Sequence, residues 1–240
     1  MLVAKRLWMI FKISSDETHH LLKGIPAYNF RFLHVSKFHS PGFAPVRDET
    51  GAFHIKQCGQ AAYKARYKNV FGFYESKAAV ESESGAFHIL SDRREAYSRR
   101  FVWCGNFQEN RCVVQDSNGN FFHIDRFGEK AYPQLYSYAG DFRDGIATAQ
   151  NEEGRYTHID VGGKPIHSSW FLDLDVYHKG FARARDERGW YHIDRQGKEL
   201  YRERYRMIEP YYNRAARVEK ENGEILRVDE SGNVLQILRI

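Results

Sequence analysis

The sequence predicts an all-β repeat protein, a six-bladed β-propeller whose repeats are about 35 residues long. Two observations predict this fold. A His-Ile pair recurs five times at steps of 34 or 35 residues, and a turn that contains Gly follows most copies. Val, Ile, Tyr, Phe and Trp gather around the pairs, and these residue types favour strands. The histidines of the pairs are His54, His88, His123, His158 and His192, and Leu226-Arg227-Val228 is a degenerate sixth copy.

Each repeat is expected to contain four short strands, with Gly-containing turns between the early ones. The alternation of side chains supports strands, because Tyr191 and Ile193 point to one face and His192 to the other. In the clearest copy the four strands are expected at residues 180–185, 190–194, 198–202 and 205–210.

This pattern resembles the WG-type bacterial repeats, whose motif reads Gly-x-Ala-x-Val, then Trp-Gly-Tyr-Ile-Asp, then Gly-Lys. The resemblance covers about residues 28–235, and residues 180–198 are its clearest copy. Where that family has Trp-Gly-Tyr-Ile-Asp, this chain has Trp190-Tyr191-His192-Ile193-Asp194. The resemblance implies a β-repeat fold in a bacterial protein. It implies no single activity and supplies no catalytic residues.

Six such repeats can close into a ring, in which each blade packs on the next and no sheet edge stays exposed. The alternative is an open β-solenoid of stacked hairpins, which needs polar residues at both ends. The C-terminal residues 234–240 are instead apolar, which favours closure. No linker-like stretch interrupts the repeats, so residues 28–240 are expected to form one β-repeat domain.

The N-terminal residues 1–27 are expected to form an arm that contains a short helix over residues 14–24. Ser14 and Glu17 have the spacing of a helix capping box, and Gly24 stands where a helix would end. The apolar stretch before them is too short for a spanning helix, and basic residues interrupt it. We therefore expect neither a signal peptide nor a membrane partner.

Composition and charge argue against several classes of partner. The three cysteines, Cys58, Cys104 and Cys112, are irregularly spaced and form no C-x-x-C pair, so neither a disulfide framework nor a zinc site is predicted. A reducing, cytoplasmic setting fits this pattern best. The net charge is +5, and the basic residues are scattered among acidic ones. This pattern indicates a mixed solvated surface and argues against nucleic acid as the partner.

The five repeated histidines are the first candidates for a ligand-binding role. Imidazoles from several blades that converge near an axis would bind a metal ion or an anionic ligand. The structural interpretation is one histidine hydrogen bond per blade, which ties neighbouring strands together. A metal needs three or four ligands within a few ångström, and equivalent atoms of different blades lie farther apart, which favours the structural interpretation. We expect no metal and no cofactor.

Two departures from the repeat are further candidates. Asp173 and Asp175 stand at i and i+2 in the most deviant copy, and would share a face on a strand. Paired carboxylates perform acid–base chemistry, although such a pair is more often solvated or tied to an arginine. Cys104, in the deviant residues 101–107, is a candidate exposed thiol, for which a structural role is the favoured interpretation. Arginines that directly precede an aromatic residue are expected to stack on the ring of that residue or to pair with acidic turns, with an anion site as the alternative; they are Arg31, Arg66, Arg100 and Arg204.

No strong enzyme signature is present: the chain lacks Gly-x-Gly-x-x-Gly, a P-loop, His-Glu-x-x-His and Gly-x-Ser-x-Gly. The sequence does not decide whether the protein is catalytic, but this absence favours a protein without enzymatic activity. We predict a binding or scaffold module that presents a propeller face to a protein partner. The alternative is an enzyme or small-ligand binder with a site in the central channel, lined by His, Arg and Asp.

Overall fold

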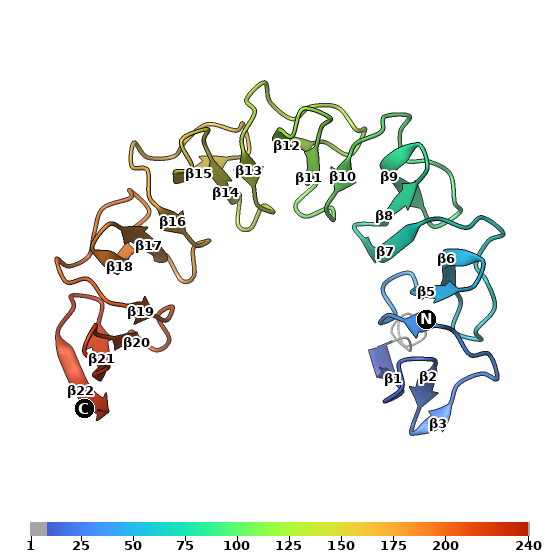
Figure 1. The fold of residues 1–240 in the computed structure, drawn as a ribbon, viewed down its shortest axis with the longest axis horizontal. Coiled ribbons are helices and arrows are strands. Elements are labelled where there is room, and N and C mark those ends of the chain that lie inside the picture. Colours follow the sequence, from blue (N-terminus) through green and yellow to red (C-terminus); the bar gives the residue numbers. More distant parts are fainter. Residues whose placement is uncertain (1–8, 240) are drawn as a thin grey trace, which may run out of the picture. The chain divides into compact units, whose positions relative to one another are not determined.

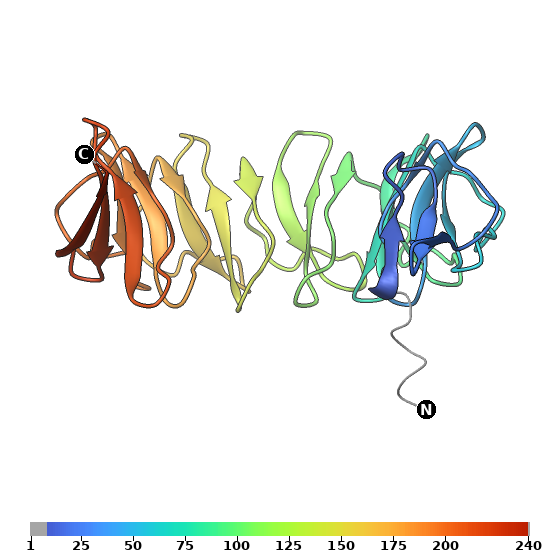
Figure 2. The ribbon, with the colours of Figure 1, turned by 90° about the horizontal axis from the view of Figure 1, so that it is seen from below.

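The computed structural model describes residues 9–239, and within them the strands form seven antiparallel sheets (Figure 1). Sheets 1 to 6, numbered in chain order, have three strands each, and sheet 7 has four. Figure 2 shows the strands of each sheet side by side, with neighbours running in opposite directions. The prediction of an all-β repeat protein is thus confirmed. The predicted number of six repeats is wrong, because residues 11–26 form an additional sheet.

The chain divides into two compact units, which are described separately. The first comprises residues 9–119 together with His123–Lys130, and the second comprises Asn120–Phe122 and residues 131–239. The strands of sheets 1 to 4 are β1 (Phe11–Ile13), β2 (His20–Leu22), β3 (Ile25–Pro26), β4 (His34–Val35), β5 (Ala44–Asp48), β6 (Gly51–Ile55), β7 (Asn69–Tyr74), β8 (Lys77–Ser82), β9 (Gly85–Leu90), β10 (Trp103–Cys104), β11 (Cys112–Gln115) and β12 (Phe121–Ile124).

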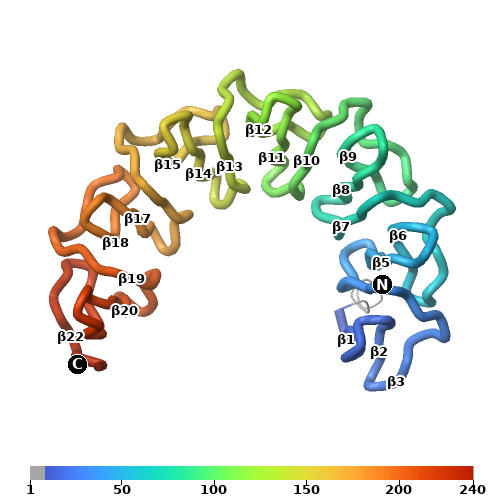
Figure 3. Tube along the Cα trace, viewed as in Figure 1, coloured from blue at the N-terminus to red at the C-terminus, as the bar shows by residue number. Residues whose placement is uncertain are grey.

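In the second compact unit the strands again follow one another in chain order within each sheet (Figure 3). The terminal sheet adds a fourth strand, which pairs with its neighbour through two irregularities in register. The strands of sheets 5 to 7 are β13 (Tyr138–Ala139), β14 (Ile146–Gln150), β15 (Tyr156–Asp160), β16 (Asp173–Leu174), β17 (Ala182–Asp186), β18 (Gly189–Ile193), β19 (Met207–Ile208), β20 (Ala215–Glu219), β21 (Ile225–Asp229) and β22 (Val234–Arg239).

Sheets 2, 4, 5 and 6 each consist of a two-residue first strand and a longer hairpin. The fourth strand expected in each repeat is wrong, because residues 198–202 form only an isolated bridge, between Ile193 and Glu199. Residues 205–210 contain β19, which is the first strand of the next sheet. A second isolated bridge joins Trp190 of β18 to Tyr205. The segment that leads into each new sheet is therefore hydrogen-bonded to the preceding one.

The helix expected over residues 14–24 is also wrong, because these residues form the turn between β1 and β2, the strand β2 itself and the start of the next turn. Ser14 Oγ donates to Asp16 Oδ1 (2.6 Å) and accepts from the backbone N–H of His19 (3.2 Å), so it stabilises a turn instead of a helix end. Glu17 and Lys23 have positive φ angles of 56° and 53°, which an α-helix excludes. No α-helix occurs anywhere in residues 9–239.

The core of each compact unit lies between successive sheets. The isoleucine of every His-Ile pair is fully buried, with no exposed surface. Complete burial of one such side chain contributes about 1.5–3 kcal/mol to the stability of the fold. Small residues of the middle strands, such as Ala44, Ala78 and Ala184, are equally buried and allow the sheets to approach closely. The buried isoleucines are Ile55, Ile89, Ile124, Ile159 and Ile193.

A glycine in the turn after the His-Ile pair packs on an aromatic ring of the preceding repeat. A Cβ atom added at Gly128 would lie 2.4 Å from Cγ of Tyr97, and the φ angle of Gly128 is 82°. The same contact joins Gly163 to Tyr132 at 2.4 Å. These turns therefore require glycine for two reasons, namely the left-handed backbone and the ring below it.

Replacing this glycine should separate the two reasons. We expect Gly128→Ala to lower the free energy of unfolding by about 2 kcal/mol or more, from backbone strain together with the clash against Tyr97. The matched control is Gly119→Ala, where φ is 86° and no atom lies within 4 Å of the added Cβ. It should cost about 1 kcal/mol, from the backbone alone. Equal losses in urea denaturation would show that the ring contact contributes nothing.

Candidate functional site

Buried histidines at equivalent positions of successive repeats make the same two hydrogen bonds with their rings. The ring Nδ1 meets a side chain eight or nine residues later, and Nε2 meets a backbone carbonyl sixteen or seventeen residues later, on or just after the first strand of the next sheet. The Nδ1 and Nε2 distances are 2.6 Å to Tyr28 Oη and 2.9 Å to Ser36 O for His20, 2.5 Å to Tyr63 Oη and 2.8 Å to Phe71 O for His54, 2.5 Å to Tyr97 Oη and 3.0 Å to Gly105 O for His88, and 2.5 Å to Tyr201 Oη and 2.9 Å to Glu209 O for His192.

This arrangement fixes the protonation state of the histidines. Because a carbonyl only accepts, Nε2 must carry the proton, so Nδ1 accepts a hydrogen bond from the tyrosine hydroxyl. Burial lowers the pKa of His54, His88 and His192 to about 4, so these rings are neutral at pH 7. Burial also raises the pKa of the partner Tyr63, which keeps its proton.

Both ring nitrogens of these histidines are therefore occupied within the fold. His123 is fully buried as well, and the sequence places Tyr132 nine residues after it. The arrangement is the one that the structural interpretation expects, with one tie between successive sheets per repeat. A ligand-binding role for the five histidines stays a prediction. Sequence analysis missed His20, which is followed by Leu instead of Ile and makes the same bonds.

One repeat departs from this pattern, because His167 replaces the tyrosine. Its Nε2 lies 3.1 Å from Nδ1 of His158, whose Nε2 donates to the carbonyl of Asp175 (2.8 Å). His158 Nδ1 must therefore accept, and His167 Nε2 must carry a proton. The other nitrogen of His167, Nδ1, is buried without a hydrogen-bond partner. Burial lowers the pKa of both rings, that of His158 to about 4.

The repeated arginines fulfil the structural interpretation. The guanidinium carbon of Arg66 lies 3.6 Å from the ring centroid of Phe53, and that of Arg204 lies 3.6 Å from the centroid of Tyr191. Arg204 also pairs with Asp186, at 2.8 Å from Nε to Oδ2. Pairing with an acidic turn is thus confirmed for Arg204, whereas the stacking is on a ring of an earlier strand and not on the aromatic residue that follows the arginine. Arg100 stacks on Phe87 at 3.8 Å, and Arg31 donates to the carbonyls of Tyr28 and Phe30.

Asp173 and Asp175 have different surroundings. Asp175 forms an ion pair with Arg183, whose Nε donates to Oδ2 (2.5 Å) and whose Nη1 donates to the carbonyl of Ile208 (2.8 Å). The side chain of Asp173 accepts from the backbone N–H of Leu174 (2.9 Å). The tie to an arginine is the more common arrangement for such a carboxylate. A ligand-binding role for the two aspartates stays a prediction.

The sequence suggested that Cys104 carries an exposed thiol, but the residue is buried, with 5% of its surface accessible. Burial raises its pKa to about 12, so the thiol is not a reactive thiolate at pH 7. The favoured structural role of Cys104 agrees with this environment. All three cysteines are free, and Cys58 is the exposed one.

The first strands of sheets 2 to 7 each begin with a side chain that the repeat does not fix. This first residue changes in chemical type from sheet to sheet, whereas the next residue is apolar and mostly buried, as in Val35, Leu174 and Ile208. The equivalence of these positions was not predicted, although their spacing of 34 or 35 residues is a signal in the sequence. The residues are His34, Asn69 and Trp103 in the first compact unit, and Tyr138, Asp173 and Met207 in the second.

In the second compact unit, one of these residues, Tyr138, belongs to a group of aromatic rings at the surface. Tyr138, which is 42% exposed, lies between Phe121 and Tyr156, with ring centroids 5.9 Å and 6.2 Å away. Trp190 occupies the position equivalent to Phe121 and Tyr156, and Arg185 lies 5.8 Å from its ring centroid. We call Phe121, Tyr138, Tyr156 and Trp190 the aromatic row.

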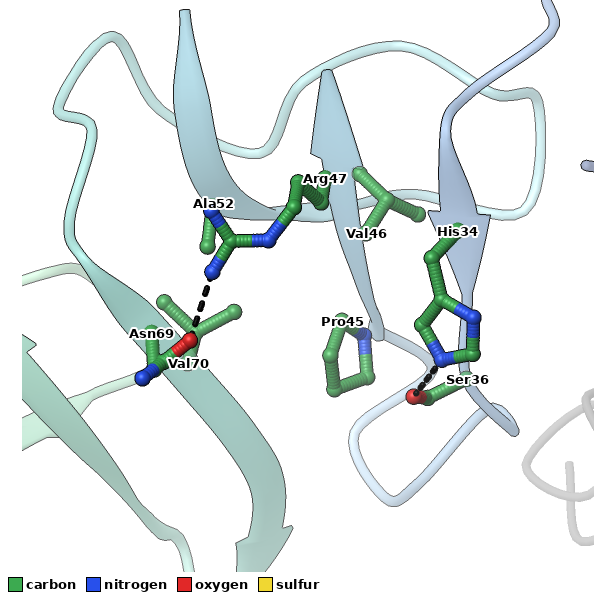
Figure 4. A pocket seen from close by; sticks show the side chains of 8 residues that line it. All are labelled: His34, Ser36, Pro45, Val46, Arg47, Ala52, Asn69 and Val70. Carbon is green, nitrogen blue, oxygen red and sulfur yellow. Dashed lines mark hydrogen bonds between the residues drawn. The ribbon is translucent and has the colours of Figure 1, made fainter. Parts of the chain in front are cut away.

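In sheet 2 of the first compact unit, Ala52 stands at the position that Phe121, Tyr156 and Trp190 occupy in their repeats. A hollow of about 100 Å³ lies beside Ala52 (Figure 4). Polar groups come from β4, β5 and β7, with Arg47 donating to Asn69 Oδ1 (2.5 Å) and His34 lying 3.5 Å from Ser36 Oγ. The remaining lining residues are Pro45, Val46 and Val70.

No group of three or more His, Cys, Asp or Glu side chains within residues 9–239 is placed to hold a metal ion. Among the same residues, no helix has the length and apolar character needed to cross a membrane.

The seven successive sheets, each tied to the next through a histidine or a bridge, have clear structural relatives. The fold is that of the β-propellers. BamB from Moraxella catarrhalis matches with a TM-score of 0.52 and 12% identity, over 90% of this chain and 78% of that one. KlHsv2 with loop 6CD replaced by a Gly-Ser linker matches with a TM-score of 0.50 and 9% identity, over 92% and 86%.

At these identities the structural likeness shows the fold alone. No protein-family model and no curated protein sequence matches the chain. Membership of the WG-type repeats stays a prediction, as do closure into a ring and the single domain over residues 28–240.

Proposed function

We propose that this propeller is a non-catalytic binding module that docks a partner protein through the aromatic row of its second compact unit. The observation that carries the proposal is the exposure of Tyr138 between two further rings, at a position where the repeat itself requires no aromatic residue. A scaffold residue recurs in every repeat, whereas a recognition residue does not have to.

The chemistry of the row favours a protein surface as its partner. Tyrosine, tryptophan and arginine are enriched in the centres of protein interfaces, where they carry most of the binding energy. Tyr138 offers a large apolar ring with a hydroxyl group, and Trp190 is flanked by Arg183 and Arg185 at 5.9 Å and 5.8 Å. Such amphipathic side chains lose little conformational entropy when they become buried.

The side chains that could act in catalysis are hydrogen-bonded or ion-paired within the fold, which supports a non-catalytic role. Both ring nitrogens are hydrogen-bonded in His54, His88 and His192. Asp175 is paired with Arg183. The proposal includes a reducing, cytoplasmic setting, which three cysteines outside any disulfide support.

The test is affinity capture from a lysate with the full chain and two variants. Proteins that the wild type retains should be lost, or bound at least tenfold more weakly, with Tyr138→Ala, which corresponds to a hot-spot loss of about 1.4 kcal/mol or more. The matched control is Tyr212→Ala, which removes a tyrosine that is even more exposed, at 56%, and that lies outside the aromatic row. Capture that is identical in all three proteins would refute the role of the row.

A further inference from the structure

The hollow in the first compact unit lies beside a small side chain. The position of this side chain, two residues before the histidine of the pair, holds an aromatic residue in three repeats of the chain, at Phe121, Tyr156 and Trp190. It holds alanine in sheets 2 and 3, at Ala52 and Ala86, and in sheet 2 the space between β5 and β7 beside Ala52 is unfilled (Figure 4). The alanine is itself buried, at 4% exposure, so its methyl group forms part of the wall.

The guanidinium group of Arg47 at this hollow has no acidic partner. Its Nη2 donates to the carbonyl of Lys68 and to Oδ1 of Asn69, and neither Nε nor Nη1 makes a hydrogen bond to a described residue. No carboxylate of residues 9–239 lies within ion-pair distance of Arg47. A half-buried cation with free donors is the group that binds a carboxylate most strongly.

The surrounding polar groups are arranged in a way that leaves this charge available. Two acidic residues lie nearby, but each has another partner: Glu17 is 3.4 Å from His34 Nδ1, and Glu81 accepts from Asn69 Nδ2 (2.5 Å). Asn69 thereby links Glu81 to Arg47 through its amide and orients the guanidinium group. His34 is paired with Arg47 across β4 and β5, so their side chains lie on the same face.

Size and lining limit what can enter. A hollow of about 100 Å³ holds a few non-hydrogen atoms, since one water molecule takes about 30 Å³. Its polar lining is Arg47, His34, Ser36 and Asn69, and its apolar wall is Pro45, Val46 and Val70. This combination suits a carboxylate on a short carbon chain, with the oxygens toward the guanidinium group.

We infer that the hollow beside Ala52 is a binding site for a single carboxylate group, recognised by Arg47. The site lies in the first compact unit and is independent of the aromatic row, so it extends the proposed function instead of resting on it. The carboxylate belongs either to a small organic acid or to an acidic side chain or C-terminus of a bound polypeptide.

The test is NMR titration of the isotope-labelled full chain with acetate at constant ionic strength. Saturable shifts of the Arg47 Nε–H and Asn69 amide signals are expected with acetate and not with acetamide. Arg47→Gln should weaken acetate binding at least tenfold. Ala52→Phe, which fills the hollow as Phe121 does in its own repeat, should abolish binding with the charge retained. If one variant fails to fold, the other still decides.

The control variant is Arg185→Gln, because Arg185 has the register position of Arg47 in a repeat where Trp190 replaces the alanine. It should bind acetate as the wild type does. N-acetylglycine and acetyl-aspartate amide distinguish the sources: tighter binding of either than of acetate indicates a polypeptide carboxylate, and binding of acetate alone indicates a small acid. The absence of saturable shifts, equal shifts with acetamide, or unchanged binding in both site variants would overturn the assignment.

Discussion

Acidification from pH 7 to pH 4 should unfold the protein in a steep, cooperative transition. The cause is the group of buried histidines, four of which have a pKa of about 4 in the folded chain against 6.5 in the unfolded chain: His54, His88, His158 and His192. Between these two values the unfolded chain binds protons that the folded chain does not. Their contribution to stability is therefore complete above pH 6.5 and is lost as the pH falls toward 4.

The expected loss of unfolding free energy is large enough to unfold the protein. One pKa unit corresponds to about 1.4 kcal/mol, so each of the four histidines contributes about 3 kcal/mol by pH 4. Together they remove about as much as the whole stability of a typical domain, which is about 5–15 kcal/mol. Ion-paired carboxylates such as Asp186, whose pKa is lowered in the fold, add to the loss only at still lower pH.

Urea denaturation at a series of pH values measures this dependence directly. The slope of the unfolding free energy against pH should approach about 1.4 kcal/mol per pH unit for each histidine near pH 5.5. His192→Gln should reduce that slope by one such increment, whatever it does to stability at pH 7. A free energy of unfolding that stays flat between pH 7 and pH 5 would contradict the neutral, buried state of these rings.

The replacement His167→Tyr should stabilise the protein by about 1–3 kcal/mol. A tyrosine hydroxyl at this position would donate to His158 Nδ1, as tyrosine does for four other histidines, and the buried Nδ1 of His167 would no longer lack a partner. An unsatisfied buried polar atom costs about that amount. Gly197, which packs on the ring of His167, leaves the same space that other turn glycines leave for tyrosine.

The reverse substitution is the matched control. Tyr201→His places the exceptional pair in the next repeat, beside His192, and should destabilise the protein by a similar amount. Midpoints of urea denaturation at pH 7.5 compare the two variants with the wild type. Stabilisation by both changes, or by neither, would show that the missing hydrogen bond is not what distinguishes the fifth sheet.

The repeat was predictable because its markers are local. A histidine and a buried isoleucine are neighbours in sequence, and their step of 34 or 35 residues needs no knowledge of the fold. The first copy escaped because Leu21 replaces the isoleucine, and because Tyr28 follows His20 by eight residues instead of nine. Ser14 and Gly24 also imitate a helix start and stop, whereas the structure uses them in turns.

The candidate sites were less predictable, because they depend on pairing between strands. Sequence placed the histidines on one face of a strand, but their partners lie up to seventeen residues away and one is a backbone carbonyl. The hollow near Arg47 follows from the register of β4 with β5 and from the absence of a ring at Ala52. An alanine where other repeats have an aromatic residue carries no signal until the equivalence of the repeats is known.

The tyrosine that binds the repeated histidine bears on how a chain of this kind gains repeats in evolution. Tyr97 binds His88 of its own repeat through its hydroxyl and supports Gly128 of the following repeat with its ring. One side chain thus makes a contact within its own repeat and another with the following repeat. A tandem duplication of one repeat in the gene would therefore supply a finished joint together with the new segment. Ancestral chains of this kind could lengthen one repeat at a time without first evolving a new interface.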